Sequence, residues 1–251
     1  MNEQIRAYRQ DKDAHGHMLL AHLQGEEAVE IIEREDGYID ASDQVGWYFS
    51  DFPDWPAQEQ EGLRYLVPGP ALDLGCGAGR VELHLQSQGR PITGIDNSPL
   101  AIEVCRRRGV LDARLLPVEK ITPDLGRFAN IIMYGNNWGL MANPRQARRL
   151  LRLFHRMTTP GARILAETND IYNTDNPLHL NYQAWNRQRG RMSGQIRIQV
   201  RYKIYRSNWF DYLMVSKAEL AEILAGTGWR LKTTIDSAGI QYVAVIEKDE
   251  G

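Results

Sequence analysis

Short apolar runs alternate with amphipathic stretches from residue 71 onward. The runs are rich in β-branched and aliphatic residues, and the stretches between them have helical spacing. Strands that alternate with helices in this way are typical of βα units and a parallel sheet. We expect strands near Ala71 to Leu74, Pro91 to Asp96, Ala113 to Leu116, Phe128 to Tyr134 and Ala162 to Glu167.

The helix between the last two of these strands has the clearest pattern. Asn143 is suited to cap its start, Pro144 suits its first turn, and Pro160-Gly161 predicts its end. Ser98-Pro99 opens a helix after the second strand in the same way. The apolar positions of the clearest helix repeat at helical spacing and leave its arginines on an outer face. They are Ala147, Leu150, Leu151, Phe154 and Met157.

The last part of the chain changes the topology. Ser216 to Glu219 form a capping box that opens a helix, and two apolar runs follow at Trp229 to Ile235 and Ile240 to Ile246. The short turn between these runs predicts an antiparallel hairpin. Residues 171–215 interrupt the order before the capping-box helix and are long enough to be an insertion. Within it, alternation from Ile196 to Tyr205 predicts an edge strand with one polar face.

The composition is that of a folded globular protein. Hydrophobic residues make up 43% of the chain and charged residues 25%, and the net charge of −2 disfavours a dedicated duplex-DNA binder. No apolar run approaches the ~18 residues of a membrane-spanning helix, and the start of the chain lacks the apolar core of a signal peptide. Cys76 and Cys105 form no disulfide framework and no metal motif. We therefore expect a cytoplasmic protein with no membrane partner and no metal site.

The charges are distributed unevenly. Twelve acidic residues against the single Arg34 lie between Glu26 and Glu61, in an arm that is also rich in aromatic residues. Six arginines and no acid lie between Arg145 and Arg163, and seven basic residues and no acid lie between 186 and 206. Solvated faces explain such runs, and so does charge-selective binding, so both interpretations stay open.

A glycine-rich turn carries the strongest chemical signal. The first strand continues into Asp73-Leu74-Gly75-Cys76-Gly77-Ala78-Gly79-Arg80 and then a helix. Glycines allow tight turns and let a ligand approach the backbone near a helix N-terminus. The second strand ends at Asp96, where an acidic side chain can bind both hydroxyls of a ribose. Together these features indicate a cofactor that contains a nucleoside.

With this Asp-x-Gly-x-Gly-x-Gly turn, the sequence resembles the class I S-adenosylmethionine-dependent methyltransferases from Ala71 to Lys248. The resemblance implies an α/β fold: a seven-stranded, mostly parallel, doubly wound sheet with a C-terminal antiparallel hairpin, an N-terminal helical cap and an insertion before the sixth strand. We expect a cap and substrate arm at 1–66, a cofactor-binding core at 67–170, an insertion or lid at 171–215 and a C-terminal completion of the sheet at 216–251.

The resemblance also implies roles for individual residues toward S-adenosyl-L-methionine. Gly75 and Gly77, with Cys76 between them, would pass the methionine part, and Asp73 would orient its amino group. The ribose and adenine would be contacted by residues after the second and third strands, namely Asp96, Asn97, Val118 and Glu119. Tyr134, at the end of the fourth strand, is placed to attract the sulfonium by its ring.

The methyl acceptor would lie at the carboxyl ends of the strands. Asn136 and Asn137 follow the fourth strand and offer donors and acceptors, although the two prolines typical of enzymes that methylate bases or amides are missing. Aromatic residues of the acidic arm are further candidates for the substrate pocket, and titratable residues are candidates for a base. The former are Tyr38, Tyr48 and Phe49; the latter are Glu167, Asp170, Tyr172, His179 and Asp40.

The sequence thus predicts a methyltransferase that uses S-adenosyl-L-methionine and acts on an oxygen or nitrogen atom of a small molecule. The alternative within the same chemistry is an RNA methyltransferase that uses the basic insertion between Arg187 and Arg206, although the small net charge and the missing prolines weigh against nucleic acid. A non-catalytic S-adenosylmethionine-binding protein and a nicotinamide-dependent oxidoreductase are alternatives from other classes.

Overall fold

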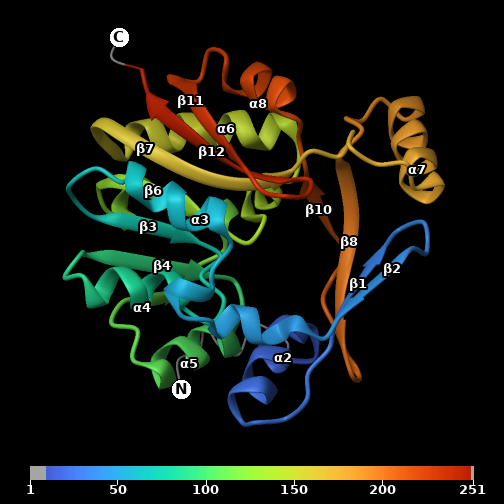
Figure 1. Cartoon of the computed structure of the whole chain (residues 1–251), viewed down its shortest axis with the longest axis horizontal. Coiled ribbons are helices and arrows are strands. Elements are labelled where there is room, and N and C mark those ends of the chain that lie inside the picture. The colour runs from blue at the N-terminus through green and yellow to red at the C-terminus, as the bar shows by residue number, and fades with distance from the viewer. Residues whose placement is uncertain (1–9, 250–251) are drawn as a thin grey trace. The chain divides into compact units, whose positions relative to one another are not determined.

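The main sheet of the protein has seven strands in the order β11-β12-β7-β6-β3-β4-β5 (Figure 1). The computed structural model describes residues 10–249 of the 251-residue chain. The strands from β5 to β7 run parallel, and β12 and β11 add an antiparallel hairpin, so the predicted fold class is confirmed. The strands are β3 Ala71–Leu74, β4 Ile92–Asp96, β5 Ala113–Leu115, β6 Phe128–Met133, β7 Thr158–Asn169, β11 Trp229–Asp236 and β12 Gln241–Lys248.

The helices between these strands begin where capping residues predict them. Ser98 Oγ accepts a hydrogen bond from the backbone N–H of Ala101, and Asn143 does the same for its own helix. Ser216 makes the full capping box with Glu219. The helices of this part of the chain are α4 Arg80–Ser87, α5 Pro99–Arg108, α6 Pro144–Arg156 and α8 Lys217–Leu224.

The predicted end of α6 at Pro160-Gly161 is wrong. The helix ends at Arg156, and β7 begins at Thr158 with both residues inside it. The reason is an irregularity in the pairing with β6, where two steps along β6 from Phe128 to Asn130 are matched by five along β7. Gly161 takes the left-handed conformation there, with φ of 67°, so the breaker residues form a bulge in a strand.

A second sheet joins the N-terminal arm to the segment that the sequence marks as an insertion. Its strand order is β10-β8-β1-β2, with β9 also paired to β8. The arm is therefore not only helical, and the predicted edge strand is wrong, because β8 has neighbours on both sides. The strands are β1 Glu30–Arg34, β2 Ile39–Ser42, β8 Gln195–Tyr202, β9 Tyr205–Arg206 and β10 Phe210–Leu213, and the remaining α-helices are α2 Ala14–Leu23, α3 Ala57–Gly62 and α7 Pro177–Gln188.

The described chain forms two compact units. The first unit contains residues up to 54, 73–120 and 197–210, and the second contains 55–72, 121–196 and the residues from 211 on. In the first unit, α2 buries Met18 and Leu19 in one cluster with Ala101 and Val104 of α5. Within the described residues, no helix is long and apolar enough to span a membrane.

In the second unit, β12 is buried on both faces. The side chain of Val243 faces Gly62 of α3, whereas the Tyr242 hydroxyl donates to the carbonyl of Val215, just before α8. Lys248 lies on the same face as Tyr242 and donates to the carbonyl of His155 in α6. Because neighbouring side chains of a strand point to opposite faces, helices cover this part of the sheet on both sides.

Candidate functional site

The glycine-rich turn between β3 and α4 lies in the first unit. The backbone N–H groups of Gly75 and Cys76 both donate to the carbonyl of Ile95 in β4, at 2.9 and 3.1 Å. Gly79 has a φ of 80°, and a Cβ there would come within 2.6 Å of the Val110 side chain. The turn is therefore held against the sheet in a conformation that needs glycine.

Asp96, the last residue of β4, is hydrogen-bonded directly to this turn. Its Oδ2 accepts from the Gly77 N–H at 3.0 Å, and its Oδ1 accepts from the Ser98 N–H at 2.8 Å. Burial raises the pKa of Asp96, and the charge of His15 acts against that rise. The structure thus brings together the turn and the acid that the sequence assigns to the ribose.

Asp73 belongs to a buried pair of acids that the sequence did not reveal. It is 3% exposed and lies beside Glu82 of α4, which is completely buried. Burial, together with the charge of Asp73, raises the pKa of Glu82 well above its usual range. Both effects favour the protonated form of Glu82. In sequence, Glu82 is indistinguishable from an ordinary acid in the first turn of a helix.

The other predicted cofactor residues of the first unit differ in exposure. Cys76 is buried with its sulfur 3.9 Å from that of Cys105, whose thiol donates to the carbonyl of Gly77. Asn97 and Glu119 are exposed, and Val118 is half-buried in the short helical turn that follows β5.

The aromatic candidates of the acidic arm lie in different places. The Tyr48 hydroxyl donates to both carboxylate oxygens of Glu30, at 3.1 and 3.2 Å, and its ring faces Gly77. Phe49 lies under the guanidinium of Arg108 on α5. Tyr38 follows the β1–β2 turn and contacts Arg34 instead. Among these three, Tyr48 is the one whose ring lies against the glycine turn.

Glu167 is the most perturbed carboxyl group of the second unit. It lies near the end of β7 and is 2% exposed. Burial and the charge of Glu59 raise its pKa to about 7. Its Oε2 accepts from the backbone N–H groups of Gly135 and Asn136, at 2.8 and 3.0 Å, and its Oε1 accepts from Gln58 at 3.1 Å. Glu167 thus fixes the loop that follows β6.

Tyr134 and Asn136 of the β6 loop are also held in place. Tyr134 is buried, and its hydroxyl donates to the carbonyl of Glu59 at 2.9 Å. The Asn136 carbonyl accepts from the hydroxyl of Tyr212, and Asn137 starts the following 3₁₀ turn.

The remaining base candidates have other surroundings. Asp170 accepts a hydrogen bond from the backbone N–H of Tyr172, and the Tyr172 hydroxyl donates to Glu219 of α8 at 2.7 Å. His179 is half-buried on α7, and Asp40 is exposed on β2. None of these contacts joins them to Glu167.

Several polar atoms at the ends of β6 and β7 are buried without a hydrogen-bond partner among the described residues. They are Asn136 Oδ1, Trp138 Nε1, Thr168 Oγ1 and Asn169 Oδ1. Asn136 and Asn169 both contact the segment around β10, the first through Tyr212 and the second through the sulfur of Met214. A buried polar atom without a partner costs about 1–3 kcal/mol. Sequence spacing gave no sign of this cluster beyond Asn136.

Comparisons with known proteins identify the fold and a domain of this chain. The S-adenosylmethionine-dependent methyltransferase from Bacteroides fragilis, solved with S-adenosyl-L-homocysteine, shares the fold with a TM-score of 0.80 at 23% identity, over 96% of this chain and 97% of that one. A family model described as a methyltransferase domain matches residues 71–161. Residues 71–161 therefore match a methyltransferase domain, and the chain has the fold of the S-adenosylmethionine-dependent methyltransferases. The turn and Asp96 both lie inside the matched range.

Two further solved structures resemble the methyltransferase less closely. The CcbJ methyltransferase from Streptomyces caelestis is 14% identical with a TM-score of 0.57, over 80% of this chain and 98% of that one. The 1,6-didemethyltoxoflavin-N1-methyltransferase from Burkholderia thailandensis is 17% identical with a TM-score of 0.50, over 83% and 85%. A comparison with curated protein sequences finds no match.

Proposed function

We propose that this methyltransferase transfers the methyl group of S-adenosyl-L-methionine to an oxygen or nitrogen atom of a small molecule. The observation that carries the choice of acceptor is the set of buried, unpartnered polar atoms at the ends of β6 and β7. The cofactor, when bound, supplies a methyl group that its positively charged sulfur already activates. The protein then has to bind, to orient and to exclude water.

The residues of the first unit fit this cofactor. Gly77 leaves open the space that a Cβ would fill in front of Tyr48 and His15, at 3.8 and 4.0 Å. Asp96 lies beside that space with lone pairs left for the hydroxyls of a ribose, and the carboxyl group of Asp73 is a candidate partner for an ammonium group. The proposed binding residues of this unit are Asp73, Gly75, Cys76, Gly77, Asp96, Asn97, Val118 and Glu119.

The polar atoms of the second unit favour an acceptor that carries hydrogen-bond donors. Within residues 10–249, Asn136 Oδ1 and Asn169 Oδ1 are acceptors without a donor, whereas Trp138 Nε1 is a donor without an acceptor. An amine or hydroxyl compound that satisfies them removes an unfavourable term of about 1–3 kcal/mol for each atom. Asn137 follows Asn136 directly in the chain. Glu167 holds the loop that carries both residues, because it accepts hydrogen bonds from the backbone N–H groups of Gly135 and Asn136.

The similarity to a small-molecule enzyme supports the same choice. The substrate of the Burkholderia enzyme, 1,6-didemethyltoxoflavin, is a small molecule that is methylated on nitrogen. That enzyme shares the fold with this chain and covers most of it, although identity is 17%. The acidic and aromatic residues of the arm suit a substrate with a positive charge.

Calorimetric titration tests the cofactor assignment. S-adenosylmethionine, S-adenosylhomocysteine and NAD are titrated into the wild-type protein, into Asp96→Ala and into the control Asp43→Ala, which alters an exposed acid without a capping hydrogen bond. We expect both adenosyl compounds to bind and NAD not to bind. Asp96→Ala should weaken binding about tenfold or more, since a hydrogen bond to a charged group is lost. Binding of NAD alone, or equal binding by Asp96→Ala and the wild type, would refute the assignment.

Methyl acceptance is then tested with labelled S-adenosylmethionine against amines, phenols and carboxylic acids. Asn136→Gly and Asn169→Ala should lower the turnover of an accepted amine or hydroxyl compound, because they remove the acceptor atoms; glycine suits position 136, where φ is 62°. Compounds that lack donors should not be methylated. If donor-free thioethers are the best acceptors, the choice of an oxygen or nitrogen acceptor is wrong.

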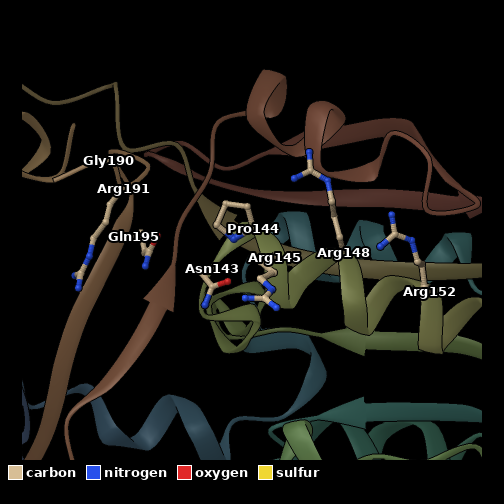
Figure 2. A pocket seen from close by; sticks show the side chains of 8 residues that line it. All are labelled: Asn143, Pro144, Arg145, Arg148, Arg152, Gly190, Arg191 and Gln195. Carbon is tan, nitrogen blue, oxygen red and sulfur yellow. The ribbon is translucent and has the colours of Figure 1, made fainter. Parts of the chain in front are cut away.

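The alternative of an RNA acceptor has one observation in its favour. A groove of about 600 Å³ in the second unit is lined by four arginines and by no acidic side chain (Figure 2). Arg145, Arg148 and Arg152 follow one another along α6, and Arg191 lies across the groove on the segment that leads into β8. Guanidinium groups in a row suit a phosphate backbone.

Retention of a labelled RNA oligonucleotide distinguishes the two acceptors. Binding that weakens steeply between 50 and 200 mM salt, and that is lost in the double variant Arg145→Ala/Arg191→Ala but kept in Arg106→Ala, would favour RNA. Arg106 is exposed on α5, in the other unit, and serves as the matched control. We expect no such binding.

A further inference from the structure

The first turn of α2 places a histidine beside the glycine-rich turn. Asp13 caps this helix by accepting from the Gly16 N–H at 3.0 Å. Its second oxygen accepts from the Ser98 hydroxyl and from the Leu100 N–H, at 2.9 and 3.1 Å. Because one buried carboxylate joins the starts of α2 and α5, the backbone at His15 is fixed relative to the end of β4.

Two partners orient the ring of His15. Its Nδ1 lies 3.5 Å from Glu30 Oε1, and the ring of Tyr48 packs against it edge-on with centroids 5.2 Å apart. Tyr48 in turn donates its hydroxyl to Glu30. A histidine whose Nδ1 faces a carboxylate has its other nitrogen directed away from it. The orientation of the ring is thus set by β1 and by the segment at Tyr48.

The other nitrogen faces the cofactor side of the turn. His15 Nε2 lies 4.0 Å from the position of a Cβ on Gly77, and no residue from 10 to 249 forms a hydrogen bond with it. Asp96, which is bonded to the Gly77 N–H, is close enough to act on the charge of His15. A hydrogen-bonding atom and a carboxylate therefore border the same open backbone.

The charges around His15 favour its protonated form. Burial lowers its pKa, but the hydrogen bond and charge of Glu30 and the charges of Asp96 and Asp13 outweigh burial, so the pKa lies above its ordinary value of 6.5. Glu30 comes from β1, Asp96 from β4, and Asp13 from the start of α2. The groups that face the ring are thus three carboxylates and the Tyr48 phenol, and they favour the imidazolium, in which Nε2 is a hydrogen-bond donor.

We propose that His15 is a second ribose-binding residue, which donates from Nε2 to a hydroxyl oxygen of the cofactor while that diol donates to Asp96. Glu30 and Tyr48 are the positioning residues that hold the imidazole in this orientation. The inference rests on the proposed cofactor and adds a residue from outside the glycine-rich core. It also makes cofactor affinity depend on pH, because the donor is lost when His15 loses its proton.

A comparison of ligands tests the assignment without any methyl acceptor. S-adenosylhomocysteine and its 2′-deoxy and 3′-deoxy analogues are titrated calorimetrically into the wild type, His15→Ala and His15→Gln. The control is His17→Ala, which changes a histidine of the same helix that stacks on Tyr205. We expect His15→Ala to lower the affinity for S-adenosylhomocysteine about tenfold. One of the deoxy analogues should bind equally well to His15→Ala and the wild type, because the contact is already missing.

The pH dependence provides a second readout. Wild-type affinity for S-adenosylhomocysteine should fall as the pH rises through the pKa of His15, which lies above 6.5, since deprotonation removes the Nε2 donor. His15→Gln, whose amide keeps a donor at every pH, should retain affinity and lose the pH dependence. Glu30→Gln should move the fall in affinity to lower pH, because it removes the carboxylate that stabilises the imidazolium.

The possible outcomes distinguish a failure of the proposed cofactor from a failure of the proposed role of His15. If the wild type does not bind S-adenosylhomocysteine, the proposed function fails. If the wild type binds it and His15→Ala binds it equally well, only the role of His15 fails. Equal weakening of all three ligands by His15→Ala would mean that the residue supports the turn without contacting the ribose, and this too would overturn the inference.

Discussion

The buried carboxyl group of Glu167 makes the stability of the protein depend on pH. Its pKa is about 7 in the folded protein, against an ordinary value of 4.5, because of burial and the charge of Glu59. The folded state therefore binds this proton more tightly than the unfolded state does. The contribution to stability is complete below pH 4.5 and is lost as the pH rises through 7. The difference in pKa corresponds to about 3 kcal/mol in total, of which about 2.5 kcal/mol falls between pH 5 and pH 8.

Urea unfolding at pH 5 and pH 8 measures this contribution. Glu167→Gln keeps the shape of the side chain and removes the titration, so its loss of stability between the two pH values should be smaller than that of the wild type by about 2.5 kcal/mol. Glu222→Gln, an exposed change on α8, should behave like the wild type. Identical pH dependence in Glu167→Gln and the wild type would refute the assignment of the buried proton.

Three local predictions can be checked with the same folded protein. Gly79→Ala should lower the free energy of unfolding by about 2 kcal/mol or more, since it places a Cβ at positive φ and against Val110; a urea midpoint equal to that of the wild type would contradict this. Ser216→Ala should cost about 1 kcal/mol through loss of the cap, and an unchanged midpoint would count against the capping box. Cys76 and Cys105 should resist a thiol reagent at pH 8 in the native protein and react with it in urea, because both are buried. The Cys105 thiol and burial also raise the pKa of Cys76, which lowers its reactivity further. Rapid labelling of the native protein would disprove this prediction.

The fold between residues 71 and 169 is predictable because its signals are local. Each strand is one apolar run, and the capping residues Ser98 and Asn143 mark the starts of helices. The second sheet is not predictable in this way. Glu33 of β1 forms an ion pair with Arg201 of β8, which lies 168 positions later in the chain. Neither strand carries a sequence feature that identifies the other as its neighbour. The prediction that Pro160-Gly161 ends α6 was wrong for a related reason. These residues fit inside β7 as a bulge, and that bulge forms only when β7 pairs with β6.

The candidate site also contains residues that a local motif predicts and residues that only long-range contacts bring together. Asp96 and the glycines follow from a motif, because their spacing along the chain reflects one turn and one neighbouring strand. His15 and Glu30 come from separate elements, and their contact with each other exists only once α2 and β1 have folded. Glu167 was a candidate from its place after a strand, but its raised pKa depends on Glu59, more than a hundred positions earlier. A pKa shift caused by a charge so far away in the chain cannot be predicted from the periodicity of the sequence.

The pairing of β1 with β8 has a consequence for protein engineering. Ile31 and Ile32 of β1 lie opposite Arg201 and Val200, so the two segments share backbone hydrogen bonds as well as side-chain contacts. A chimera that exchanges the N-terminal arm alone would leave β8 with an open edge, and unpaired edges promote association with other chains. The arm and the strand from 195 to 202 therefore have to be transplanted together, as one cassette, if this enzyme is recombined with a relative to change its substrate.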